Sequence, residues 1–253
     1  MRQHVTLLAI GLFVVLTLQL GCTNTKTSTD NPTEKNMKNE QQKQNPVVLI
    51  NLFEVPAENE DGFVEGWKAA ADYLREQEGF VSTALRQSID PTARFQYINI
   101  AVWNSPKDFK TATSSEAFQP IRLELKETKA QGTPSLFQII PIPEKKAPAE
   151  FHAQYLAEDI VFLINPFKDI PADADDKFIS GWHAAELYLK KQKGYIDTAL
   201  HQSISETAFR FINVAVWASA KDFQTAVSNE EFRQIGGKIP YTAYPSLYKV
   251  IAQ

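Results

Sequence analysis

A repeated pattern of apolar and polar positions organises this chain. Apolar residues alternate along residues 95–103 with the two-residue period of a β-strand that has two unlike faces. Ser105 follows at an N-cap position, with Pro106 in the first helical turn and Asp108 three residues after the serine. The same pattern returns at residues 209–223, so we infer that the chain is a tandem duplication.

The other predicted elements also occur twice and in the same order. Each copy opens with an apolar strand and continues with an amphipathic helix, which ends at Gly79 or Gly194 where a left-handed C-cap is expected. A second strand, the repeated strand and helix, and a final strand complete each copy. The predicted opening, second and final strands are 47–53, 80–87 and 134–137 in the first copy and 161–167, 195–202 and 245–248 in the second.

The resulting order βαββαβ predicts an α+β fold of the ferredoxin-like type, in which helices cover one face of each sheet. The second copy is the obvious cover for the other face, which predicts a barrel-like pseudo-dimer within one chain. We place the first domain at 46–142, a proline-punctuated charged linker at 143–159 and the second domain at 160–253.

The amino terminus predicts export and lipidation. A short basic start precedes an apolar run with the proportions of a signal-peptide core, so residues 1–21 are interpreted as a signal peptide. Leu20, Gly21 and Cys22 resemble the lipobox of bacterial lipoproteins, which makes Cys22 the expected lipidation site. An ordinary secretory signal or a membrane anchor is the alternative. Residues 22–45 are polar and predict a disordered tether, so we expect a lipid-anchored protein outside the cytoplasm.

Composition removes several functional classes. The formal net charge is −4 and no Lys/Arg stripe stands out, so nucleic acid is not an expected partner. The single cysteine excludes an intramolecular disulfide and a cysteine-based zinc site. No histidines have the spacing of a metal site, and no Gly-x-Ser-x-Gly or glycine-rich phosphate loop is present. We therefore expect no metal site and no glycine-rich nucleotide site.

The repeated residues resemble a known family. Five repeated features resemble antibiotic biosynthesis monooxygenase (ABM) domains. They are the asparagine of the first strand, the Gly-Trp pair of the first helix, the Ile-Asn-Val-Ala-x-Trp strand, the Ser-x-x-Asp-Phe helix start and the closing Pro-Ser-Leu-Tyr strand. The resemblance covers both copies. It implies two tandem ABM domains that form a dimeric α+β barrel inside one chain, with further oligomerisation left open.

The resemblance implies two chemistries. Some members of the family oxidise polycyclic phenols to quinones with dioxygen and no cofactor. Others degrade haem, using an asparagine, a tryptophan and an iron-ligating histidine. The histidine position falls near Arg122 in the first copy and Gly236 in the second, and neither residue can ligate iron, so haem degradation is disfavoured.

The resemblance also supplies candidate residues. The catalytic candidates are Asn51, Trp103, Asn165 and Trp217. Each asparagine is either a hydrogen-bond donor in a pocket or a residue that satisfies a neighbouring strand, and each tryptophan either lines the pocket or fills the core. The residues themselves add candidate pocket residues: Asn99 and Asn213, which share a strand face with these tryptophans, and Arg86 and His201, which are basic at equivalent positions and are rim contacts to an acidic ligand. Trp67 and Trp182 are assigned to the core, and His183 to a solvated helix face.

The expected function is that of a membrane-tethered, cofactor-independent monooxygenase acting on a small aromatic or phenolic compound. The alternative is a non-catalytic envelope lipoprotein, either a binder of a hydrophobic ligand or a structural module. A cavity beside Asn51 or Asn165 would favour an enzyme or a binder, whereas a packed interior would favour a structural role.

Overall fold

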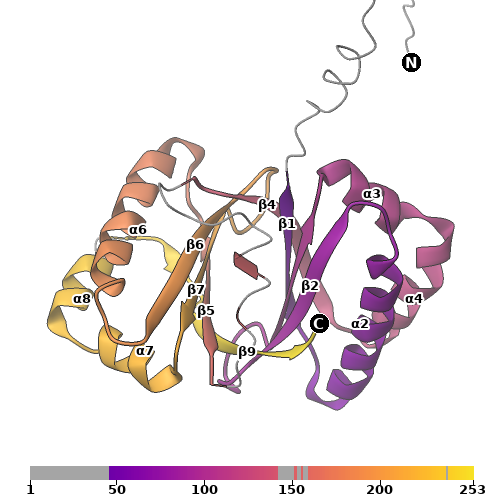
Figure 1. The fold of residues 1–253 in the computed structure, drawn as a ribbon, viewed down its shortest axis with the longest axis horizontal. Coiled ribbons are helices and arrows are strands. Elements are labelled where there is room, and N and C mark those ends of the chain that lie inside the picture. Colours follow the sequence, from indigo (N-terminus) through magenta and orange to yellow (C-terminus); the bar gives the residue numbers. More distant parts are fainter. Residues whose placement is uncertain (1–45, 142–150, 153–154, 156–158, 238) are drawn as a thin grey trace, which may run out of the picture. The chain divides into compact units, whose positions relative to one another are not determined.

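The computed structural model describes residues 46–141, 151–152, 155, 159–237 and 239–253 (Figure 1). The predicted signal peptide, the tether with Cys22 and most of the linker lie outside the described residues. Within the described ranges, no helix combines the length and the apolar character needed to cross a membrane.

Both copies fold in the predicted order, but the second helical segment of each copy is divided into two helices. The elements of the first copy are β1 (Val47–Glu54), η1 (Ala57–Asn59), α2 (Glu60–Arg75), β2 (Phe80–Ser88), β3 (Tyr97–Trp103), α3 (Pro106–Ser114), η2 (Glu116–Phe118), α4 (Gln119–Glu127) and β4 (Gln131–Ile139). Those of the second copy are β5 (Val161–Lys168), η3 (Ala172–Ala174), α6 (Asp175–Leu189), β6 (Tyr195–Ser203), β7 (Phe211–Trp217), α7 (Ala220–Val227), α8 (Glu230–Gly236), β8 (Thr242–Ala243) and β9 (Ser246–Ala252).

The turns that connect helix to strand follow the sequence signals. Gly79 and Gly194 have φ angles of 79° and 80°, the left-handed conformation that ends α2 and α6. A Cβ at Gly79 would also lie 2.4 Å from Cβ of Asp108. Ser105 caps α3, because its Oγ accepts a hydrogen bond from the backbone N–H of Asp108 and donates one to the carboxylate of Asp108. Ser219 caps α7 in the same way.

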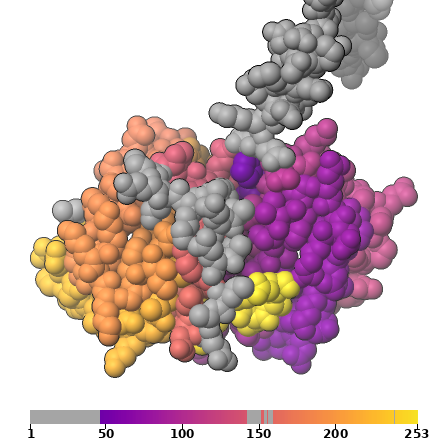
Figure 2. All heavy atoms as spheres, in the orientation of Figure 1, coloured from indigo at the N-terminus to yellow at the C-terminus, as the bar shows by residue number. Residues whose placement is uncertain are grey.

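The two copies share one closed sheet. The strand order is β7-β6-β4-β1-β3-β2-β9-β5-β8, and a further pairing of β7 with β5 closes it. Two pairings join the copies, β4 with β6 and β2 with β9. Figure 2 shows the C-terminal residues in yellow against the purple surface of the first copy. The predicted α+β barrel pseudo-dimer is therefore confirmed, with its two halves joined edge to edge.

The closed sheet has two differently packed faces. Side chains at Val48, Ile50 and Leu52 belong to one apolar core that also includes residues of the second copy, such as Phe162 and Ile164. Because successive strand residues point to opposite faces, Leu49 and Asn51 face the helices instead. The helices lie on the outside of the sheet in both copies (Figure 1). Each copy thus has its own space between helices and sheet.

Candidate functional site

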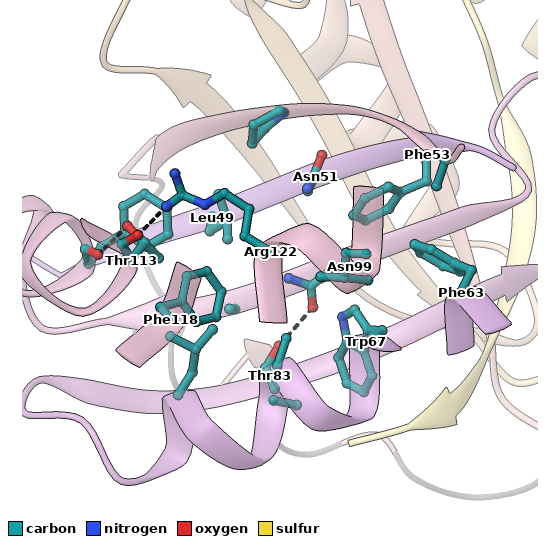
Figure 3. A pocket seen from close by; sticks show the side chains of 18 of the residues that line it. Leu49, Asn51, Phe53, Phe63, Trp67, Thr83, Asn99, Thr113, Phe118 and Arg122 are labelled. Atoms are coloured by element: carbon teal, nitrogen blue, oxygen red, sulfur yellow. Dashed lines mark hydrogen bonds between the residues drawn. The ribbon is translucent and has the colours of Figure 1, made fainter. Parts of the chain in front are cut away.

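A cavity of about 480 Å³ lies between the helices and the sheet of the first copy (Figure 3). Its size is within the range of about 300–1,000 Å³ that is usual for small-molecule sites. The wall is mostly apolar and comes from β1, β2, β3, β4, α2, α3, η2 and α4. The lining residues used below are Asn51, Trp67, Thr83, Asn99, Phe109, Phe118, Arg122 and Lys126.

Two asparagine amides lie next to each other in this wall. Asn51 and Asn99 are direct cross-strand partners in the pairing of β1 with β3. The Oδ1 atom of Asn99 accepts a hydrogen bond of 2.7 Å from Oγ1 of Thr83 on β2, which fixes the amide orientation (Figure 3). The Oδ1 atom of Asn51 is buried and has no hydrogen-bond partner among the described residues. An unpaired buried amide oxygen is costly, so Asn51 has hydrogen-bonding capacity for a ligand.

Two exposed cationic side chains border the same cavity. Arg122 and Lys126 come from α4 and occupy its solvent side. Arg122 donates a hydrogen bond to the carbonyl oxygen of Thr113 on α3, and its guanidinium lies 5.7 Å from the ring centre of Phe118. These contacts hold a positive charge at the edge of an apolar space, where it would favour an anionic ligand.

The tryptophans are distributed differently from the sequence-based interpretation. Trp103 is fully buried and does not line the cavity; its ring lies 5.7 Å from that of Phe109, which does. Trp217 is equally buried in the second copy, and its ring centre lies 5.6 Å from that of Tyr195, which lines the cavity there. Trp67 is buried, as its assignment to the core requires, but it also lines the cavity. An apolar helix face predicts burial and does not reveal a neighbouring cavity.

The second copy has a smaller cavity, of about 220 Å³. Asn165 and Asn213 are again cross-strand partners, and Oδ1 of Asn165 again lacks a partner among the described residues. The Oδ1 atom of Asn213 accepts hydrogen bonds from Oγ1 of Thr198 at 2.8 Å and from Nε1 of Trp182 at 3.0 Å. The structure therefore brings the two predicted asparagines together in both copies.

The rim positions predicted for Arg86 and His201 are wrong. Both side chains are fully buried, with 1% and 0% exposure, and they point into the barrel interior, away from both cavities under the helices. They alternate with Leu85 and Leu200, which face the helices, so the strand period places them on the opposite face. The guanidinium of Arg86 lies 4.6 Å from the ring centre of Phe162, and burial lowers its pKa to about 10.

A histidine pair lies in the same interior. The Nε2 atoms of His152 and His201 are 3.1 Å apart, and Nδ1 of His201 lies 3.2 Å from the carbonyl oxygen of Ile212. Burial lowers the pKa of His201 to about 4, and burial, with the positive charge of Arg86 among the smaller causes, lowers the pKa of His152 well below its usual value. This pair was not predicted, because nothing in the sequence places the linker residue His152 against β6.

The lining of the two cavities limits their chemistry. No histidine lines either of them among the described residues, and Arg122 and Gly236 fall where haem-degrading members of the resembled family use the iron ligand. The donor set therefore does not fit haem. Across the described part of the chain, no three His, Cys, Asp or Glu side chains come close enough to hold a metal ion. Both cavities have a pair of asparagine amides in an otherwise mostly apolar wall.

Comparison with known proteins gives a family match in each copy. The family model described as antibiotic biosynthesis monooxygenase matches residues 46–122 and again residues 160–237. No curated protein sequence matches the chain.

Among solved structures, an anthrone oxidase-like protein is similar over 83% of this chain and 92% of its own, with 14% identity and a TM-score of 0.63. A protein from Shewanella loihica PV-4 has 41% identity over 38% of this chain and 96% of its own, with a TM-score of 0.33. SnoaB, a cofactor-independent oxygenase from Streptomyces nogalater, has 24% identity over 40% of this chain and 99% of its own, with a TM-score of 0.35. The first of these supports the fold over nearly the whole described region.

Proposed function

The chain belongs to the antibiotic biosynthesis monooxygenase family, and from this premise we propose that it is a cofactor-independent monooxygenase acting on a small aromatic or phenolic compound. The observation that carries the proposal is the cavity of about 480 Å³ in the first copy, where the amides of Asn51 and Asn99 interrupt an apolar wall. A packed interior, which would have favoured a purely structural role, is not what this copy contains.

The proposed reaction oxidises a phenolic ring or an anthrone-type methylene carbon to a quinone carbonyl. Dioxygen accepts four electrons from the substrate. One oxygen atom becomes the new carbonyl oxygen, and the other leaves as water with two hydrogens that the substrate loses. The substrate anion supplies the electrons, so the protein has to favour that anion and protect it from bulk solvent.

The residues of the first copy suit this task. The Nδ2 group of Asn99 is available as a donor to a phenolate oxygen because Thr83 occupies the other end of the amide. Asn51 offers a second amide beside it. Arg122 and Lys126 add positive charge at the open side, which stabilises an aromatic anion relative to its neutral form. The apolar remainder of the wall holds the ring.

The first test is oxygen consumption by the purified protein with anthrone and naphthol as probes and no added cofactor. We expect turnover, and we expect Asn99→Ala to lower kcat/KM by about 100-fold, the usual cost of one lost donor at a developing oxyanion. Asn59→Ala is the matched control, because Asn59 precedes α2 without a side-chain capping bond. No turnover by the wild-type protein with any such probe, together with direct binding of the probe, would make the chain a non-catalytic binder.

We also propose that Cys22 is lipidated and that the enzyme is tethered to a bacterial membrane outside the cytoplasm. The proposal rests on Leu20, Gly21 and Cys22 after an apolar run. In a bacterial host, the wild-type chain should fractionate with membranes and incorporate labelled palmitate. Cys22→Ala should abolish the label, and a label that persists in this variant would refute the assignment.

A further inference from the structure

The barrel interior contains a buried cation whose charge no carboxylate balances. The side chain of Arg86 is 1% exposed, and no aspartate or glutamate among the described residues forms an ion pair with it. A buried charge is costly unless it is paired and its hydrogen bonds are satisfied. The ring of Phe162, whose centre lies 4.6 Å from the guanidinium carbon, offsets part of this cost through its π face. That contact leaves the N–H groups in the guanidinium plane unused.

The unused donors of Arg86 lie along one edge of the guanidinium. Its Nη1 atom donates a hydrogen bond of 3.2 Å to the carbonyl oxygen of Ala84. Its Nε atom is buried and has no partner, and Nη2 also has none among the described residues. Nε and Nη2 together present two parallel N–H groups, which is the edge that binds both oxygens of a carboxylate. The open edge of Arg86 is therefore complementary to a planar oxyanion.

Arg210 uses the same edge elsewhere in the chain. Its Nε and Nη2 atoms donate to Oδ1 and Oδ2 of Asp175, at 2.5 and 2.6 Å. Arg210 is only partly buried, so water could replace this partner. Arg86 is more deeply buried and has less access to water, yet it lacks the carboxylate that Arg210 has. Of the two arginines, Arg86 therefore gains more from an anion.

The equivalent position in the second copy does not have the same need. His201 takes the place of Arg86 there, and both of its ring nitrogens have neighbours, Nδ1 at 3.2 Å from the carbonyl oxygen of Ile212 and Nε2 at 3.1 Å from Nε2 of His152. Burial lowers the pKa of both histidines, so both are neutral near pH 7. This histidine pair therefore adds no charge that an anion would balance, and the unmet need belongs to Arg86.

We propose that the barrel interior is a binding site for a small carboxylate anion, whose two oxygens accept hydrogen bonds from Nε and Nη2 of Arg86. Phe162 beside the guanidinium belongs to the apolar core that the two copies share, so the ligand is a short-chain acid such as formate or acetate. The site lies on the opposite face of the sheet from the proposed oxygenase cavity and does not depend on turnover there.

Isothermal titration calorimetry on the full chain tests the proposal, with formate as the probe and chloride as the comparison at equal ionic strength. We expect saturable binding of formate, at least about tenfold tighter than that of chloride, because two charge-assisted hydrogen bonds to separate oxygens are stronger than two that share one spherical ion. Arg86→Lys keeps the charge but has no planar edge, so it should weaken formate binding by at least about tenfold. Arg86→Met keeps an apolar stem without the charge and should abolish binding.

Arg210→Lys is the matched control. It makes the same substitution at an arginine whose edge Asp175 already occupies, so formate should bind as it does to the wild-type protein. Four results would overturn the proposal: no saturable formate binding, equal affinity for chloride, binding that survives Arg86→Met, or an equal loss in Arg210→Lys. Because the readout is binding inside the barrel, a failure here leaves the oxygen-consumption test untouched, and the reverse also holds.

Discussion

Mild acid should destabilise this protein through the buried pair of His152 and His201. Both rings are enclosed in the barrel interior, and their Nε2 atoms are 3.1 Å apart, so one ring must donate and the other accept. A proton on the accepting ring would remove that bond and place a second cation near Arg86. The folded state therefore resists protonation, and the pKa of His201 falls from 6.5 to about 4.

The sign and size of the effect follow from linkage. Well above pH 6.5 neither state binds the proton, so His201 does not affect stability. As the pH falls below 6.5, His201 becomes protonated in the unfolded chain but stays neutral in the folded chain. The free energy of unfolding therefore falls until the pH reaches about 4. Between pH 7.5 and pH 5, these two pKa values give a loss of about 2 kcal/mol from His201 alone.

Urea unfolding at pH 7.5 and pH 5 measures this loss. The wild-type protein should lose about 2 kcal/mol more than His201→Gln, which keeps hydrogen-bonding capacity but does not titrate. Carboxylates also titrate over this range, but they contribute equally to both proteins and cancel in the difference. Asn59→Ala serves as the control, because Asn59 precedes α2 without a side-chain capping bond and does not titrate. Equal losses in wild type and His201→Gln would refute the buried neutral pair.

Three further outcomes are expected from the turns and the proposed oxygenase site. Gly79→Ala should lower the unfolding free energy by about 1–3 kcal/mol or more, since its φ of 79° and the close Asp108 both oppose a Cβ; unchanged urea unfolding would contradict this. Ser219→Ala should cost about 1 kcal/mol through the lost cap of α7, measured in the same way. Thr83→Val should lower kcat by about tenfold by freeing the Asn99 amide to rotate, whereas Thr83→Ser should restore it; equal rates in the two variants would remove Thr83 from the orienting role.

Much of the fold could be predicted from local sequence because its determinants are local. Positive φ at Gly79 and the cap at Ser105 depend on residues a few positions away, and both occur as expected. The strand alternation at residues 97–103 also determines which side chains share a face, and Asn99 lines the cavity between helices and sheet. The duplication then predicted the pseudo-dimer, because the sheet face of each copy that the helices leave open has to pack against the other copy.

The parts that could not be predicted depend on contacts between distant segments. Arg86 and His201 are basic residues at equivalent positions, which suggested a shared rim contact, but Arg86 is buried against Phe162 of the other copy. The orientation of the Asn99 amide depends on Thr83, a residue of a neighbouring strand. The period of the strands reveals which face a residue occupies, but it does not reveal whether that face borders a cavity or a packed core.

The duplication itself explains how the two cavities of one chain can have different linings. In an assembly of two identical subunits, a substitution such as alanine to glutamate at the position of Ala71 would alter both cavities together. Once the copies are joined in one chain, Glu186 can change the second cavity while the first keeps its apolar wall and the cation Arg122. The shared sheet still requires both copies to fold, and the serine caps of α3 and α7 are the same in the two copies. The lining of the two cavities differs on helices and strands alike: Glu186 on α6 and Gly236 on α8 replace Ala71 and Arg122, and Tyr195 on β6 replaces Phe80.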